Sequence, residues 1–133
     1  MTKYTKGELN KILEDHKLWL NDKTTGKRAD LRGANLFNLF LDGVDLRYAN
    51  LENADLRNTN LRYAKLYKAD LIGANLIDAD LRHADLRDAT LNGAHLENAN
   101  MFKANLGHTE QGYANLSHAI LSGVIFTDTR NEW

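Results

Sequence analysis

Several features that often define a protein are missing from this sequence. Cysteine is absent from all 133 residues, which excludes disulfides, thiol nucleophiles and thiolate metal sites and agrees with a reducing compartment. Proline is absent too. No apolar stretch approaches the length that spans a bilayer, and the polar N-terminus is not followed by the apolar core of a signal peptide. We therefore expect a soluble, cytoplasmic protein.

An excess of one charge is also lacking. The chain has 17 basic and 18 acidic residues and a formal net charge of −1, so total charge favours neither nucleic acid, nor a membrane surface, nor a strongly cationic partner. Residues 29–128 hold nine basic and 13 acidic side chains. This part of the chain is therefore mildly acidic.

What the sequence does contain is a five-residue period. From residue 29 to residue 128 it forms 20 consecutive pentapeptides without an insertion, of which Ala29-Asp30-Leu31-Arg32-Gly33 is the first. The central position is leucine in 17 of the 20, and the position two residues earlier is usually alanine. The central exceptions are Met101, Gln111 and Phe126.

This period predicts a coil of extended segments. In an α-helix each residue turns about 100°, so a five-residue period would spread the leucines around the whole helix. In an extended chain, residues two apart point the same way, which places Ala29 and Leu31 inward and Asp30 outward. The next two residues then turn a corner. Successive coils would stack at about 4.8 Å and satisfy each other's backbone groups.

The repeated A(D/N)LXX pattern resembles the pentapeptide-repeat family. The resemblance implies an all-β solenoid, a right-handed quadrilateral β-helix with four pentapeptides per coil and about five coils. It covers the predicted repeat domain, 29–128. We expect an N-terminal capping helix and linker at 1–28 and a short tail at 129–133.

Both ends of such a solenoid need protection, because they expose unpaired backbone. Thr5 and Glu8 have capping-box spacing, and apolar residues follow with helical spacing, which predicts a helix over residues 6–21 packed on the first coil near Trp19. Phe37 and Phe40 are expected under or beside this helix. At the other end, outward positions become apolar, and pentapeptide-repeat proteins commonly dimerise through this end. The predicted dimer interface contains Ile120, Val124, Ile125, Phe126 and Trp133. Capping by the tail is the alternative.

No constellation of residues predicts catalysis. Leucine and alanine fill the expected interior, so we predict no enzyme activity, no cofactor and no metal site. Two neighbouring outward sides instead mix arginines with aromatic residues, as protein interfaces often do. The alternative is a solvated surface whose arginines pair with Asp80, Asp85 and Asp88. The candidate partner surface comprises Arg47, Arg62, Tyr67, Arg82, Arg87 and Phe102.

One irregular segment interrupts the repeats. Between Gly107 and Gly112, Thr109 and Gln111 replace the usual inward alanine and leucine. We expect a bulge or small bent loop there and add Gln111 to the candidate partner residues.

These features favour a non-catalytic scaffold that binds an unidentified protein, with a possible homodimer and without membrane or direct nucleic-acid binding. The family resemblance offers an alternative, a DNA mimic that binds type II topoisomerases such as gyrase and confers quinolone resistance. That mechanism requires a strongly negative rod, whereas arginine columns interrupt the acidity here. A role in bacterial development is a third possibility implied by the resemblance.

Overall fold

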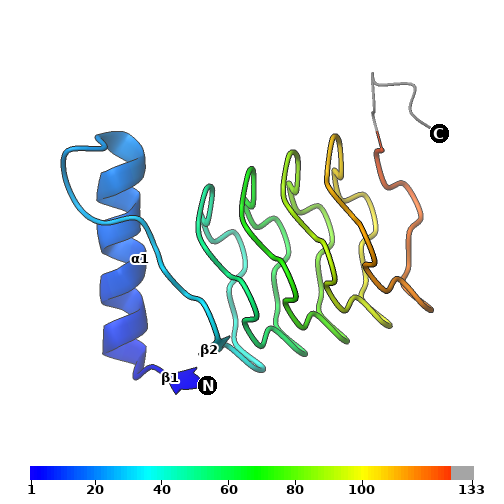
Figure 1. Cartoon of the computed structure of the whole chain (residues 1–133), viewed down its shortest axis with the longest axis horizontal. Helices are drawn as coiled ribbons and strands as arrows, with labels where there is room; N and C mark the ends of the chain where they lie inside the picture. The colour runs from blue at the N-terminus through cyan, green and yellow to red at the C-terminus, as the bar shows by residue number, and fades with distance from the viewer. Residues whose placement is uncertain (127–133) are drawn as a thin grey trace.

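The protein is a stack of four-sided coils with one helix at its N-terminal end, as Figure 1 shows. This computed structural model describes residues 1–126. The regular elements are strand β1 (Thr2–Lys3), helix α1 (Lys6–Asn21) and strand β2 (Ala34–Asn35). Beyond β2, coils are joined by 16 isolated parallel bridges, each between residues 20 apart, such as Asp30 with Asn50 and Asn105 with Ile125. Four pentapeptides therefore complete one coil.

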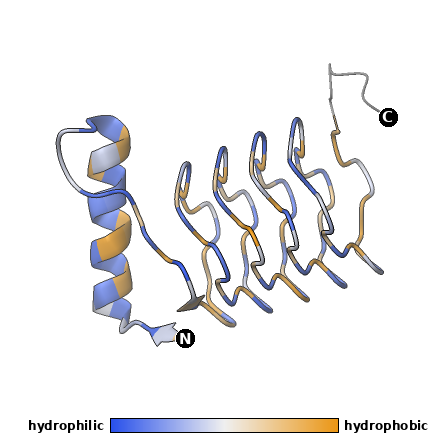
Figure 2. Cartoon of the chain, in the orientation of Figure 1, coloured by the Kyte–Doolittle hydropathy of each residue, from blue (hydrophilic) through white to orange (hydrophobic). Residues whose placement is uncertain are grey.

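We number the four sides by their inward residue in the first coil: Leu31, Leu36, Leu41 and Leu46. Each side has one outward residue before the inward leucine and two residues after it, of which the second is the corner. Hydropathy repeats at the same places from one coil to the next (Figure 2). Only one residue per side forms the bridge, so the expected all-β solenoid contains little formal strand.

The corners have left-handed backbone conformation. From Gly33 to Gly123, every described corner residue has φ between +54° and +71°, and most are not glycine. An amide after each corner donates to the inward residue's carbonyl, as Ala34 does to Leu31 at 3.1 Å. Positive φ at the third residue of such a turn is characteristic of a type II turn.

Outward asparagines and aspartates hold these turns. Asp70 Oδ1, for example, accepts a hydrogen bond at 3.0 Å from the backbone amide of Ile72, and Asn100 Oδ1 accepts one at 3.1 Å from Phe102. This is the Asx-turn geometry, which explains why Asp and Asn recur although both are poor strand formers.

The interior is filled by two kinds of side chain. Inward leucines between Leu46 and Leu96 are at most 1% exposed, and the inward alanines beside them are equally buried. Large and small side chains thus alternate in a narrow, close-packed interior. A coil filled in this way encloses hydrocarbon, and its chemistry lies on its outer surface.

Helix α1 begins and packs as the sequence predicts. Thr5 is the N-cap, with a capping box to Glu8, and Leu9, Ile12 and Leu13 pack against the core. Trp19 reaches the first coil, where its ring lies edge-on to Tyr48 at a centroid distance of 6.3 Å. The N-terminal end of the coils is therefore covered by α1.

A buried histidine joins α1 to the first coil. His16 is 0% exposed; its Nε2 lies 2.9 Å from the Arg47 carbonyl oxygen, and the Ala29 amide donates to its Nδ1 at 2.9 Å. These partners require a neutral ring with the proton on Nε2. In later coils the carbonyl equivalent to that of Arg47 accepts from the corner amide of the preceding coil, as Tyr67 does from Tyr48. No coil precedes the first one, and the His16 ring makes the hydrogen bond to Arg47 that a corner amide of a preceding coil would make.

Strand β1, which was not predicted from the sequence, also covers the N-terminal end. It pairs in parallel with β2, with Thr2 opposite Ala34 and Lys3 opposite Asn35. The second side thus gains an additional strand. Phe37 and Phe40 were expected under or beside α1; they are 48% and 89% exposed, so they are not buried under it. The observed α1 bonds reach Ala29 and Arg47 instead, away from the corner between these phenylalanines.

The last coil departs from the repeat pattern at Thr109 and Gln111, which replace the usual alanine and leucine. The bridge from Thr90 to Glu110 keeps the 20-residue register, so the bulge expected between Gly107 and Gly112 is wrong. The Gln111 side chain donates to Thr109 Oγ1, which donates to the Leu106 carbonyl oxygen. This internal pairing removes the need for a bulge.

Candidate protein-interaction surface

The third and fourth sides bring most of the candidate residues together. After the inward residue, the third side carries Arg62, Arg82 and Phe102 in successive coils, and the fourth side carries Tyr67 and Arg87, because the bridges hold residues 20 apart side by side. The corner between these sides adds Tyr63 and His83. We call this set the Arg–aromatic surface: Arg62, Tyr63, Tyr67, Arg82, His83, Arg87 and Phe102.

Two of its arginines are bound by aspartates of their own repeat. Arg82 donates through Nε and Nη2 to the two carboxylate oxygens of Asp80 at 2.9 and 2.6 Å. Arg87 binds Asp85 in the same way at 2.8 and 2.7 Å. These hydrogen bonds lower the pKa of both carboxyl groups. This is the pairing that the solvated-surface alternative predicts for Asp80 and Asp85, whereas among residues 1–126 Asp88 forms no such ion pair.

The same bidentate pair recurs elsewhere on the coils. Within residues 1–126, every Asp-Leu-Arg sequence forms it, with the aspartate before the inward leucine and the arginine after it. The pairs are Asp30 with Arg32, Asp45 with Arg47, Asp55 with Arg57, Asp80 with Arg82 and Asp85 with Arg87. An arginine in this arrangement has its Nε edge occupied.

Arg62 differs because Asn60 stands where the aspartate would be. Asn60 Oδ1 accepts only the backbone amide of Arg62, at 3.1 Å. Among the described residues no hydrogen-bond partner is found for the Arg62 Nε, although that atom is buried. The guanidinium lies 5.7 Å from the centroid of the Tyr63 ring. Its charge is therefore not neutralised within its repeat.

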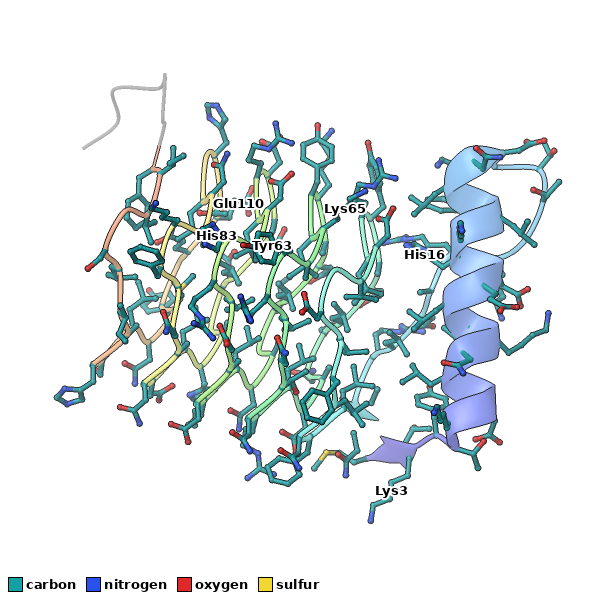
Figure 3. All side chains as sticks on the ribbon, turned by 180° about the vertical axis from the view of Figure 1, so that it is seen from behind. Lys3, His16, Tyr63, Lys65, His83 and Glu110 are labelled. Carbon is teal, nitrogen blue, oxygen red and sulfur yellow. The ribbon has the colours of Figure 1, made fainter. Side chains whose placement is uncertain are left out.

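A stack of rings runs along the corner beside Arg62. The rings of Tyr63 and His83 are parallel, with centroids 4.8 Å apart and planes inclined by 2°. Phe102 continues the stack edge-on to His83 at 5.9 Å. Figure 3 shows Tyr63 and His83 side by side on successive coils. Tyr63 is 52% exposed, so the stack presents aromatic area to a partner.

A second aromatic row lies on the next corner, toward α1. Tyr48 contacts Tyr67 edge-on at 5.7 Å and Trp19 on its other side. Cations accompany this row: Arg87 lies 5.5 Å and Lys68 5.6 Å from the Tyr67 ring centroid. Both rows are therefore held by contacts between neighbouring coils, which fixes their side chains before any partner binds.

Two candidate residues lie away from this surface. Arg47 belongs to the fourth side but lies in the first coil, where its side chain pairs with Asp45 and its carbonyl binds His16. Gln111 lies on the first side, in the last coil, hydrogen-bonded to Thr109. The structure adds Tyr63 and His83, neither of which is among the candidate partner residues predicted from the sequence. The spacing could have indicated His83, because Tyr63, His83 and Lys103 are 20 residues apart and therefore lie at the same corner in successive coils.

The predicted dimer residues lie at the C-terminal end. Ile120, Ile125 and Phe126 are 48%, 44% and 47% exposed, whereas Val124 packs against the core. Trp133 lies outside the described residues. The exposed residues form an apolar end, and dimerisation through it stays a prediction.

Other kinds of site find no support in the described part of the chain. Residues 1–126 contain no group of three or more potential metal-binding histidine, cysteine, aspartate or glutamate side chains. Within the same range, the helix is too short and too polar to cross a bilayer.

Comparison with known proteins places these features in a family. The pentapeptide-repeat family model matches residues 27–62, 41–78 and 79–110. Among solved structures, the chain is similar to the pentapeptide-repeat protein Rfr23 from the cyanobacterium Cyanothece 51142, with 37% identity, a TM-score of 0.48, and coverage of 80% of this chain and 69% of that one. No curated protein sequence matches the chain.

The chain is also similar to two solved proteins with a stated biological role. HetL from Nostoc sp. strain PCC 7120, involved in heterocyst differentiation regulation, is 32% identical with a TM-score of 0.38 over 74% of this chain and 58% of its own. Trypsin-treated QnrB1, a plasmid-mediated fluoroquinolone resistance protein, is 24% identical with a TM-score of 0.47 over 77% of this chain and 60% of its own. The chain thus spans less than two thirds of either protein. The family-model match extends over more than half of the sequence, and the chain therefore belongs to the pentapeptide-repeat family.

Proposed function

We propose that this chain is a non-catalytic interaction scaffold that binds a protein partner through the Arg–aromatic surface. The observation that supports this most directly is the ordered ring stack of Tyr63, His83 and Phe102 beside arginines on one corner of a filled coil. Aromatic and arginine side chains contribute most of the binding energy at many protein interfaces. Stacking between coils means that little side-chain freedom is lost on binding.

A scaffold role also agrees with the interior. The inward leucines and alanines leave the coil no ligand-sized space between them, and the outer carboxylates mainly hold turns or arginines. A catalytic acid or base needs a cleft and a perturbed environment. We therefore propose no reaction for this chain.

The solenoid is proposed to be right-handed, as in the pentapeptide-repeat proteins it resembles, with α1 as its N-terminal cap. The capping role is supported by the His16 hydrogen bonds and by the apolar contacts of Leu9, Ile12 and Leu13. A cytoplasmic location and a homodimer through the C-terminal coil remain part of this proposal.

The gyrase alternative has no specific support in the geometry. Mimicry of DNA needs a continuous acidic surface, whereas Asp30, Asp45, Asp55, Asp80 and Asp85 each carry a bound arginine. We do not propose it as the function.

Photo-crosslinking tests the scaffold proposal. Tyr63 and Tyr113 are both exposed corner tyrosines with positive φ, but they lie on opposite corners of the solenoid. Each would be replaced in turn by p-benzoylphenylalanine in cells of the source organism. We expect a discrete crosslinked partner from position 63 and not from position 113. Equal labelling from both positions, or none from position 63, would contradict the proposed surface.

A further inference from the structure

We infer that Arg62 is a binding site for a carboxylate of the partner protein, an aspartate or glutamate side chain that supplies the negative charge missing from the Arg62 repeat. This inference rests on the proposed function, since it specifies the chemistry of the partner at the Arg–aromatic surface. The supporting observation is the difference between the repeat of Asn60 and Arg62 and the five Asp-Leu-Arg repeats.

The five Asp-Leu-Arg repeats show what an arginine does at this position of the coil. Each guanidinium folds back over its own outward aspartate and makes two charge-assisted hydrogen bonds, with Nη2 to Oδ2 distances of 2.6 or 2.7 Å. The arrangement is the planar, two-point match that arginine makes with carboxylates. The backbone of the repeat at Arg62 is the same, but the outward residue is Asn60, a neutral amide.

Arg62 thus has no hydrogen-bonded carboxylate, although its charge adds to the lowering of the pKa of Asp80 on the next coil. Within residues 1–126 its guanidinium has no ion pair, and its buried Nε has no hydrogen-bond partner. The Nη atoms are not among the buried unpaired atoms, so they reach solvent. An incoming carboxylate would therefore bind the exposed Nη edge, unlike the internal aspartates, which bind Nε and Nη2.

The surroundings favour a single carboxylate over phosphate. Arg82, the next arginine on the same side, is occupied by Asp80, and that carboxylate would repel a doubly charged phosphate. Nucleic-acid backbones are bound by several cations at once, whereas among the arginines of the Arg–aromatic surface one guanidinium, that of Arg62, has no ion pair. A carboxylate, which carries one negative charge, matches the single positive charge of Arg62.

The neighbouring ring stack extends the site. Arg62 lies beside Tyr63, which stacks on His83. A partner segment with an acidic residue next to an apolar or aromatic one would place its carboxylate on Arg62 and its neighbour on the rings. The Lys65 side chain is exposed on the adjacent side, as Figure 3 shows, and adds attraction for an acidic segment.

Asn60→Asp is the decisive variant. It creates a sixth Asp-Leu-Arg repeat, so Arg62 should pair within its own repeat as the other five do, without disturbing the coil. Asn75→Asp is the matched control, because it adds the same charge at the same repeat position before Ile77, where no arginine follows. Both variants should unfold at temperatures close to that of the wild type.

The probe is the dipeptide acetyl-Glu-Phe-amide, compared with acetyl-Gln-Phe-amide and with inorganic phosphate. Binding is followed by NMR through the Nε–Hε signal of Arg62, which is assigned by its loss in Arg62→Lys. We expect the glutamate peptide to move this signal saturably, and at least tenfold weaker binding by the glutamine peptide. We also expect at least tenfold weaker binding by Asn60→Asp and unchanged binding by Asn75→Asp.

Three results would overturn the inference: equal binding of the two peptides, unchanged binding by Asn60→Asp, or tighter binding of phosphate than of the glutamate peptide. Crosslinking from position 63, repeated in the Asn60→Asp background, separates the two proposals. A partner captured equally well in that background would leave the scaffold proposal standing and remove the carboxylate site. If position 63 captures no partner but the peptide response is as expected, the carboxylate site stands and the scaffold proposal is removed.

Discussion

At the scale of single residues, the corner position is where the chain departs furthest from ordinary backbone geometry. Tyr48, Tyr63, Lys68 and Lys103 all adopt positive φ there, between +54° and +64°. Left-handed conformation costs a residue with a Cβ roughly 1–2 kcal/mol relative to glycine. Burial of the inward leucine offsets that cost in most repeats.

Gly93→Ala tests this cost without a steric complication. Gly93 has φ +67°, and a Cβ at this position would meet no atom within 4 Å. We expect the free energy of unfolding to fall by about 1 kcal/mol, because only the backbone conformation is penalised. Urea titration followed by circular dichroism measures the change.

Gly7→Ala is the control for that substitution. Gly7 also has open space around a would-be Cβ but lies in α1 without positive φ, so alanine should leave stability unchanged or raise it. Losses of equal size at both glycines would show that the corner conformation is not the cause.

The inward leucine gives the largest single-residue effect. Leu76 is 0% exposed, so Leu76→Ala should cost about 2–5 kcal/mol through lost contacts and a cavity. Leu76→Asp should prevent folding, since it buries an unpaired charge. Thermal unfolding measures both; a modest effect of the aspartate would mean that this column contacts water.

At the scale of elements, α1 is joined to the coil through His16. Burial lowers the pKa of His16 below its usual value of 6.5; the hydrogen bond to Arg47 and the charge of Asp45 act in the opposite direction, and Arg28 and Lys23 add to the lowering. The unfolded chain therefore binds a proton at His16 more readily than the folded one. Stability from this residue is present above about pH 6.5 and is lost as the pH falls toward the lower folded-state pKa.

We expect the wild-type free energy of unfolding to decrease between pH 7 and pH 5, and His16→Gln to remove most of that slope. His118→Gln should keep it, because His118 is an exposed corner residue. Urea titrations at several pH values measure the slopes. The paired aspartates have lowered pKa values, so their contribution is lost only in more acidic solution and does not obscure this window. A slope that persists in His16→Gln would assign it to other groups.

The elements also show how far sequence reasoning extends. The five-residue period predicts the coil because it runs from residue 29 to residue 128 without an insertion, and the capping box at Thr5 predicts the start of α1. Strand β1 has only two residues, too few for any period to appear. The role of His16 depends on a carbonyl 31 residues away, and the stack at His83 depends on ring orientation, which spacing alone does not determine.

At the scale of the whole molecule, the two ends of the solenoid are treated differently. α1 and β1 cover the N-terminal end, whereas Ile120, Ile125 and Phe126 are exposed at the other. Exposed apolar groups next to unpaired backbone favour association. A two-fold contact would cover both copies at once.

Ile125→Lys should therefore convert a dimer into a monomer, because it places a charge in the proposed interface. Ile72→Lys is the matched control, since Ile72 is similarly exposed (39% against 44%) but lies in the middle of the solenoid. Sedimentation velocity at micromolar concentration measures both. A wild-type monomer, or a dimer that tolerates lysine at position 125, would contradict the predicted interface.

Because four pentapeptides make one coil, a change in chain length of five residues and a change of 20 residues have different effects on this architecture. Adding or removing one pentapeptide keeps every later leucine inward, so the core tolerates it, but it turns all later outward residues by a quarter of the coil. A pentapeptide inserted between Arg62 and His83 would give both residues different neighbours although neither had mutated. Only a change of four pentapeptides restores both. Length variation in steps of five can thus rearrange the binding surface while folding is preserved, and a gene could change partner by duplication alone.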